Sequence, residues 1–154
     1  MMARYGKLNI KELKKFQEDL QKLQDPDAFV EACAKELAAR LLAKVIKRTP
    51  VGQYPKGSGK MGGTLRRGWT GQKRGSATDY ANSLAIEHIG NLYKIDIINP
   101  VEYASYVEYG HRTADHSGWV NGQFMMTISE QELQAIAPQV LENKIRKYLN
   151  EVMK

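Results

Sequence analysis

Apolar residues recur at two different spacings along the chain, and the spacing predicts which segments form helices and which form strands. Over residues 9–23 they recur every three or four positions, as on one face of a helix, and Asn9 with Glu12 forms the pattern of a capping box. The same spacing continues over residues 25–48, which begin with an Asp-Pro pair suited to a helix start. We therefore expect two helices, over 9–23 and 25–48.

A third helical pattern closes the chain. Residues 129–153 carry an apolar stripe that begins at a second capping-box pattern, Ser129 with Glu132. Pro138 lies inside this stripe, and proline removes a backbone hydrogen bond and crowds the preceding turn of a helix. We expect a C-terminal helix over 129–153 that is kinked or broken near residue 138.

Alternation of apolar and polar residues marks the middle of the chain. Two alternating runs lie on either side of Gly90-Asn91, a pair typical of two-residue hairpin turns, and they predict a β-hairpin over 84–98. A shorter alternation predicts a strand near 65–70. Residues 101–109 change to a spacing of three, which indicates one or two helical turns ending at Gly110.

Past Gly110, the pattern predicts a polar loop from His111 to Gly118 and a short strand at Trp119-Val120. The overall order of helices, strands and a last helix favours an α+β fold. In it, a long N-terminal helix and a C-terminal helix pack on a small antiparallel β-sheet, with a long Gly- and basic-rich loop. A length of 154 residues suits one core, so we interpret 1–154 as a single domain.

The apolar runs are too short for a membrane helix, and no apolar signal region follows the first residues. We therefore expect synthesis in the cytoplasm and no contact with a membrane. Cys33 is the single cysteine, which excludes an intrachain disulfide. It lies within a helical apolar pattern, so we interpret it as a small core residue.

Charge is distributed unevenly within a net charge of +6. Residues 51–82 hold six basic residues and one acidic residue, whereas residues 83–128 hold two basic and five acidic ones. Eight glycines also lie within 51–82, so we expect a mobile basic loop over 53–82. Such a loop can attract a polyanion or become ordered against a neighbouring subunit.

The sequence contains no strong catalytic motif. Gly57-Ser58-Gly59-Lys60 lacks the four residues that separate the glycines of a phosphate-binding loop. His111, Asp115 and His116 are residue types that bind metals, but we interpret them as part of a polar surface loop. We predict that the protein is not an enzyme and that it has no catalytic residue, no cofactor and no metal site.

The basic segment leaves one alternative function open, a small nucleic-acid-binding protein that acts through residues 56–74. Tyr54 and Trp69 could stack on bases. Phosphates could be contacted by six basic side chains, those of Lys56, Lys60, Arg66, Arg67, Lys73 and Arg74.

Four sequence blocks follow one another in a particular order: Thr49–Gly52, Gly63–Trp69, Asn99–Arg112, and Gly118–Met126 before the last helix. They read Thr-Pro-Val-Gly, Gly-Thr-Leu-Arg-Arg-Gly-Trp, a block containing Tyr-Ala-Ser-Tyr-Val-Glu-Tyr-Gly, and Gly-Trp-Val-Asn-Gly-Gln-Phe-Met-Met. In their order and spacing, the chain resembles the tail-completion (head–tail joining, or neck) proteins of long-tailed bacteriophages and prophages. The resemblance covers about residues 29–150.

This resemblance implies a structural virion protein that is synthesised in the cytoplasm of a bacterial host. It implies a place in the neck, at the head-proximal end of the tail, and a homo-oligomeric ring that we expect to be hexameric. The implied partners are head-closure proteins and tail-terminator or tail-tube proteins. DNA would only pass through the lumen of the ring.

A ring needs heterologous contacts, in which one surface of a subunit meets a different surface of the next. The basic loop and the acidic segment after it are two such unlike surfaces. Tyrosine, tryptophan and arginine are enriched at interface centres. We therefore predict that a subunit or partner interface includes Arg66, Arg67, Trp69, Tyr103, Tyr106, Glu108, Tyr109 and Arg112. For Tyr103 and Tyr106, packing on the sheet is the alternative.

Overall fold

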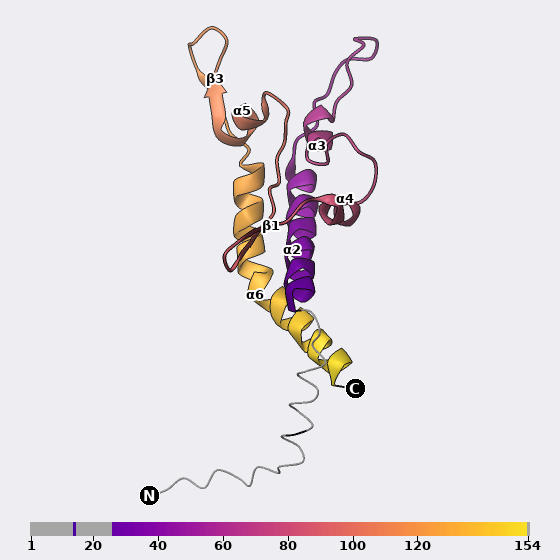
Figure 1. The fold of residues 1–154 in the computed structure, drawn as a ribbon. Coiled ribbons are helices and arrows are strands. Elements are labelled where there is room, and N and C mark those ends of the chain that lie inside the picture. The colour runs from indigo at the N-terminus through magenta and orange to yellow at the C-terminus, as the bar shows by residue number, and fades with distance from the viewer. Residues whose placement is uncertain (1–13, 15–25, 154) are drawn as a thin grey trace, which may run out of the picture.

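The structure is a computed structural model that describes residue 14 and residues 26–153. Two long helices, α2 (Pro26–Arg48) and α6 (Met125–Val152), run side by side in opposite directions (Figure 1). The chain between them forms short elements only: α3 (Thr64–Gly68), α4 (Ala77–Ser83), β1 (Glu87–Ile89), β2 (Leu92–Lys94), α5 (Ala104–Tyr109), β3 (Gly110–Arg112) and β4 (Trp119–Asn121).

Contacts spaced along α2 and α6 hold the two helices together. Near the start of α2, the Phe29 and Tyr148 rings stack with their centroids 4.4 Å apart. Two turns further, the Lys144 ammonium lies 2.6 Å from a Glu36 carboxylate oxygen. The partners on α6 come earlier in the chain as those on α2 come later, so the packing is antiparallel.

At the other end of α2, the Glu132 carboxylate accepts hydrogen bonds from two basic side chains. Lys44 Nζ lies 3.2 Å from one oxygen, and an Arg48 Nη contacts the other. The prediction of a helix over 25–48 is confirmed within one residue. The helix predicted over 9–23 lies outside the described residues, apart from residue 14.

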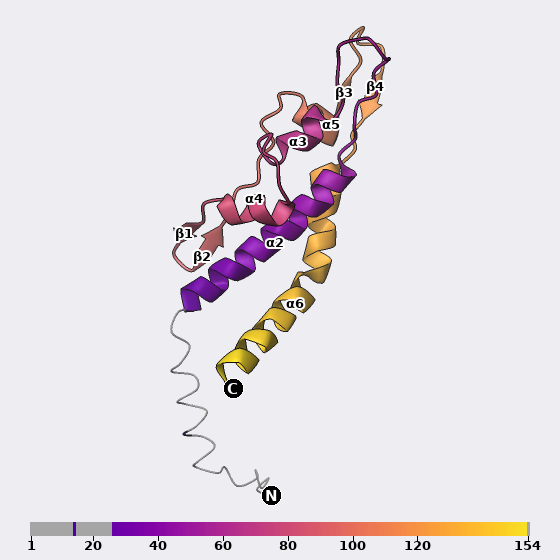
Figure 2. The same ribbon diagram turned by 90° about the vertical axis from the view of Figure 1, so that its right-hand side faces the viewer.

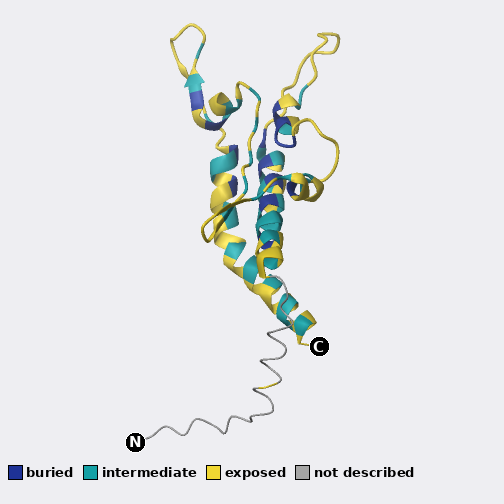
Figure 3. Ribbon diagram, in the orientation of Figure 1, coloured by how far each residue is buried: buried dark blue, intermediate teal, exposed yellow. Residues whose placement is uncertain are grey.

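The core lies where α2 meets α3, α4 and the first turn of α6, and Figure 3 shows buried residues along α2 and near α3. In the described part of the chain, eight hydrophobic residues are buried: Cys33, Ala38, Leu42, Val45, Leu65, Trp69, Ala81 and Met125. Burial also raises the pKa of the Cys33 thiol, as expected of a core residue.

The strand predicted near 65–70 is wrong, because residues Thr64–Gly68 form the helix α3. Leu65 and Trp69 are both buried, and their separation of four residues fits one face of a helix as well as one face of a strand. Arg67, between them, would share their face in a strand, yet it is exposed.

The basic segment 53–82 is not one continuous loop, because it contains α3 and most of α4. A capping box that the sequence analysis overlooked starts α4. The Ser76 hydroxyl accepts from the Asp79 amide at 3.1 Å, and the Asp79 carboxylate accepts from the Ser76 amide at 3.3 Å.

The hairpin predicted over 84–98 is confirmed around Gly90-Asn91, but only three residues of each strand pair. The predicted turns before Gly110 form α5, and Gly110 ends that helix with a φ of 89°. A second hairpin, β3–β4, includes His111, which the sequence analysis had placed in a loop. The α+β class is therefore confirmed, with two small antiparallel sheets in place of one.

The last helix begins at Met125, four residues before the predicted start. The capping box predicted at Ser129 is wrong, because this buried residue donates from its hydroxyl to the Met125 carbonyl, while Glu132 contacts α2. We predicted a kink or a break near Pro138; the chain stays helical through this residue, so the break does not occur. Figure 1 shows the helix changing direction along its length.

Candidate assembly interface

One end of the molecule carries two projections, and we call it the forked end (Figures 1 and 2). The first projection is residues 50–63, which extend from the end of α2 and return to α3. The second is the β3–β4 hairpin, residues 110–121. The forked end consists of these two projections, of α5, and of residues 122–124, which join the second projection to α6.

Three predicted interface tyrosines lie at the forked end on or next to α5, and all three are exposed. The exposed fractions are 44% for Tyr103, 58% for Tyr106 and 64% for Tyr109. The inner side of α5 is formed by Ala104 and Val107, which pack against the core. The tyrosines therefore present aromatic surface to solvent.

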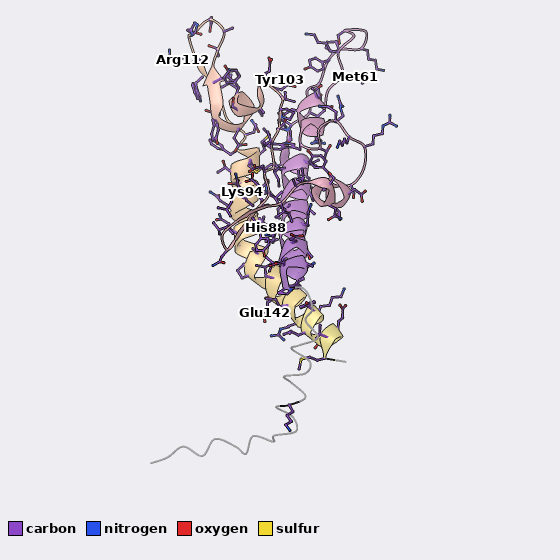
Figure 4. The ribbon with its side chains drawn as sticks, in the orientation of Figure 1. Met61, His88, Lys94, Tyr103, Arg112 and Glu142 are labelled. Atoms are coloured by element: carbon purple, nitrogen blue, oxygen red, sulfur yellow. The ribbon has the colours of Figure 1, made fainter. Side chains whose placement is uncertain are left out.

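Arg112 is the fourth candidate that the structure places at the forked end. It is exposed on β3, where it is the register partner of Trp119 on β4. In Figure 4, Arg112 lies on one projection, Met61 lies on the other, and Tyr103 lies between them.

The sequence analysis missed further exposed apolar side chains at this end. On the first projection they are Val51, Tyr54 and Met61; on or beside the second they are Trp119, Val120 and Phe124. One available signal was the Gly118–Met126 block, which places Trp119 and Phe124 close together in a stretch too short to bury them. For Met61, the sequence pattern gave no indication that the side chain is exposed.

Glu108, in contrast, is only 6% exposed and is not available to a partner. Its carboxylate accepts hydrogen bonds from the amides of Met126 and Thr127, each at 2.9 Å, and from the Thr127 hydroxyl at 2.6 Å. These are groups in the first turn of α6, whose amides have no partner inside the helix. Glu108 therefore caps α6 in this chain, and it is buried rather than part of the surface where we predicted a subunit or partner interface.

Trp69 is also turned inward, with 5% of its surface exposed. Its indole Nε1 donates to the Thr49 hydroxyl at 2.8 Å, and that hydroxyl donates to the Val45 carbonyl at 2.6 Å. The bond ties α3 to the last turn of α2. Trp69 is therefore a core residue of this chain rather than part of its surface.

The two arginines of α3 support the first projection. Arg66 donates from Nε and Nη2 to the Thr49 carbonyl, at 3.1 and 2.7 Å, and so caps the end of α2. Arg67 is exposed but donates to the Gly62 carbonyl at 3.2 Å. Both contacts fix the base of residues 50–63.

A pocket of about 460 Å³ lies between the first projection and α5. Its lining is mainly apolar and includes Val51, Tyr54, Met61, Tyr103 and Val107. We call it the fork pocket. Its lining joins three of the sequence blocks, Thr49–Gly52, Gly63–Trp69 and Asn99–Arg112, in one surface.

The loop at the tip of the second projection is closed by Asp115. Its carboxylate accepts from the Thr113 hydroxyl at 2.6 Å and from the Ser117 hydroxyl at 2.7 Å, and these bonds lower its pKa to about 2. Among the described residues, no group of three or more His, Cys, Asp and Glu side chains is placed to hold a metal ion. Over the same residues, no helix combines the length and apolar character needed to span a bilayer.

A protein-family comparison matches residues 14–110, more than half of the chain, to the HK97-gp10-like family, described as "Bacteriophage HK97-gp10, putative tail-component". The chain belongs to the HK97-gp10-like family. It is thus a structural component of a phage tail and not an enzyme, as the sequence resemblance implied. No curated protein and no solved structure matches the chain.

The extent of the HK97-gp10-like match divides the forked end. The matched residues include the first projection, α3 and α5, and they end at Gly110, where the second projection begins. The fork pocket therefore lies wholly within the family's shared region.

Proposed function

We propose that the protein forms a ring at the head–tail interface of a tailed phage or prophage, as a tail-completion (head–tail joining) protein of the neck. The ring is hexameric and lies between head-closure proteins and tail-terminator or tail-tube proteins. DNA passes through its lumen without being recognised. Tyr103, Tyr106, Tyr109, Arg112 and Arg67 belong to the surfaces that contact subunits or partners.

The observation that carries this proposal is the exposure of Tyr103, Tyr106 and Tyr109 between two projections that also expose apolar side chains. The described residues include seventeen large hydrophobic side chains that are exposed, against eight hydrophobic residues that are buried. Six of these exposed side chains lie on or beside the two projections, in addition to the three tyrosines, and exposed apolar side chains that gather at one end of a protein are typical of an interaction site. A tail component has such a partner in its own copies and in adjacent virion proteins.

Two of the residues on which the nucleic-acid alternative depends are engaged within the chain. Trp69 is buried and cannot stack on a base, and Arg66 donates to the Thr49 carbonyl.

Light scattering coupled to size-exclusion chromatography tests the proposal. The full chain is measured alone and mixed with the products of the neighbouring genes. We expect a mass six times that of the 17.4-kDa chain, or a stable complex with a neighbour. Cryo-microscopy of the particle then locates the ring. A chain that stays monomeric with every neighbour, and shifts a labelled DNA at physiological salt, contradicts the proposal.

A further inference from the structure

The β1–β2 hairpin presents a small apolar tip. Ile89 and Leu92 lie on either side of the Gly90-Asn91 turn and are 55% and 69% exposed. Two residue pairs behind the tip anchor the hairpin to α2: His88 Nε2 lies 2.8 Å from a Glu31 carboxylate oxygen, and the Tyr93 hydroxyl donates to Asp27. The tip is therefore held in a fixed position while its two aliphatic side chains face solvent.

The fork pocket is an apolar site that matches the apolar side chains of the hairpin tip. Its rim is formed by Val51, Tyr54, Met61 and Tyr103, which are 42%, 49%, 79% and 44% exposed. A volume of about 460 Å³ lies in the range of protein pockets that hold a small apolar group. Because this rim is apolar, an apolar protein segment suits it better than a phosphate backbone does.

The charges around the two surfaces are opposite in sign. The first projection carries Lys56 and Lys60, and the Lys60 ammonium lies 5.8 Å from the centre of the Tyr54 ring at the pocket. Beside the hairpin tip, Glu87 and Asp96 share the single Lys94, at 3.9 and 3.3 Å. The hairpin therefore has an excess of negative charge, whereas the surroundings of the fork pocket have an excess of positive charge. Opposite charges favour contact of the hairpin with the fork pocket over contact between two hairpins or between two fork pockets.

The two surfaces lie apart: the hairpin lies beside the start of α2, and the fork pocket lies just past the end of α2 (Figure 2). They do not overlap, so one subunit can use both at once. We propose that the hairpin tip of one copy of this chain, Ile89 and Leu92, inserts into the fork pocket of the next copy. The contact is heterologous and, repeated around a rotation axis, generates a closed ring. This inference rests on the proposed function and names the surfaces that join its subunits.

Disulfide trapping tests the contact in the assembled state. In a Cys33→Ala background, Met61→Cys and Leu92→Cys are combined in one chain, and the assembled protein or particle is oxidised and run on a non-reducing gel. We expect a ladder of covalent oligomers that a thiol reagent collapses to monomer. Each single variant is expected to give no ladder, because the contact joins unlike surfaces.

A matched control pairs Met61→Cys with Glu142→Cys, which places the second thiol at an exposed site on α6 far from the forked end (Figure 4). It measures cross-linking by random collision. A ladder of equal intensity in this control overturns the inference.

Complementation gives a second readout that needs no cross-link. Leu92→Asp removes the tip and Met61→Asp removes the rim of the pocket, and both sites are exposed, so both variants are expected to fold. Each variant alone should be monomeric. A mixture should form a one-to-one heterodimer and nothing larger, because only one intact contact remains.

The failures of the two proposals are distinguishable. If the wild-type chain forms rings and both Asp variants do so equally well, the hairpin contact is overturned and the ring stands. If the wild-type chain forms no ring alone, with neighbours or in the particle, the proposed function fails and the hairpin contact fails with it.

Discussion

The carboxylate of Glu108 accepts two hydrogen bonds from Thr127, one from its amide at 2.9 Å and one from its hydroxyl at 2.6 Å. A carboxylate at this position satisfies amides that the helix itself leaves unpaired, and the helix dipole favours its negative charge. Glu108 belongs to the six-residue helix α5, so one side chain fixes the tyrosine-bearing helix to the start of α6. The geometry of the forked end depends on this contact.

We expect Glu108→Ala to lower the free energy of unfolding by about 2–3 kcal/mol, because the partly buried amides of Met126 and Thr127 lose a charged acceptor. Glu108→Gln should cost about half as much, since its amide oxygen can still accept from Thr127. Urea denaturation of the full chain measures both. Glu102→Ala, at an exposed position on the same segment, is the control and should change little. An equal loss in the control contradicts the capping role.

The hydrogen bond from Trp69 to Thr49 gives a second stability prediction. Trp69→Phe keeps most of the ring in the core but removes the Nε1 donor, and the buried Thr49 hydroxyl loses a partner. We expect a loss of about 1–2 kcal/mol in the free energy of unfolding. In a double-mutant cycle with Thr49→Val, the combined variant should lose less than the sum of the single losses. Additive losses show that the bond does not couple the two residues.

The long helices could be predicted from the sequence because their periodicity extends over many turns. The start of α6 could not, since its cap is Glu108, 18 and 19 positions before the amides that it accepts from. A local capping pattern at Ser129 indicated a start four residues too late. Capping by a residue that is distant in sequence leaves no local signal.

The exposure of the candidate interface residues could be predicted where the spacing of apolar residues carried the information. Ala104 and Val107 form the inner side of α5, and Tyr106, which lies between them in the sequence, faces solvent. Residue type alone was a poor guide at Trp69 and Glu108, because a tryptophan or a carboxylate suits an interface and an interior equally. Their burial is decided by Thr49 and Thr127, which folding brings close from distant positions.

The ion pairs between α2 and α6 predict a pH dependence. The hydrogen bond from Lys144, followed by that from Arg40, lowers the pKa of Glu36 below its ordinary 4.5. The bond from Arg48, followed by that from Lys44, lowers the pKa of Glu132 in the same way. A carboxyl whose pKa is lower in the folded state stabilises the fold above its unfolded pKa, and this contribution is lost as pH falls through the folded value. Stability should therefore decrease on acidification below about pH 4.5.

Replacement of one partner tests this assignment. Lys144→Gln should be less stable than the wild-type chain at pH 7 and should lose less stability between pH 7 and pH 3, because Glu36 then titrates closer to its ordinary pKa. Urea midpoints at the two pH values measure the difference. Arg146→Gln breaks an exposed pair with Glu142 on the outer side of α6 and is the matched control. If the pH dependence of stability is unchanged in Lys144→Gln, the titration of Glu36 does not contribute to it.

The exposed tyrosines give the prediction closest to function. Tyr109→Ser removes an aromatic side chain that is 64% exposed and whose ring lies edge-on to that of Phe124, with ring centroids 6.5 Å apart. We expect the free energy of unfolding of the monomer to change by less than about 0.5 kcal/mol. Its assembly into rings or complexes with neighbouring tail proteins should weaken by at least about tenfold, as expected for truncation of an aromatic residue at the centre of an interface.

Mass photometry over a dilution series measures the assembly constant for Tyr109→Ser and for a control at the opposite end of the molecule. Met153→Ser removes an apolar side chain that is 40% exposed beyond the end of α6 and should assemble like the wild-type chain. If both variants weaken assembly equally, general surface hydrophobicity drives association and the forked end has no special role. A loss confined to Tyr109→Ser places the interface on α5, where Glu108 and Thr127 hold it in position.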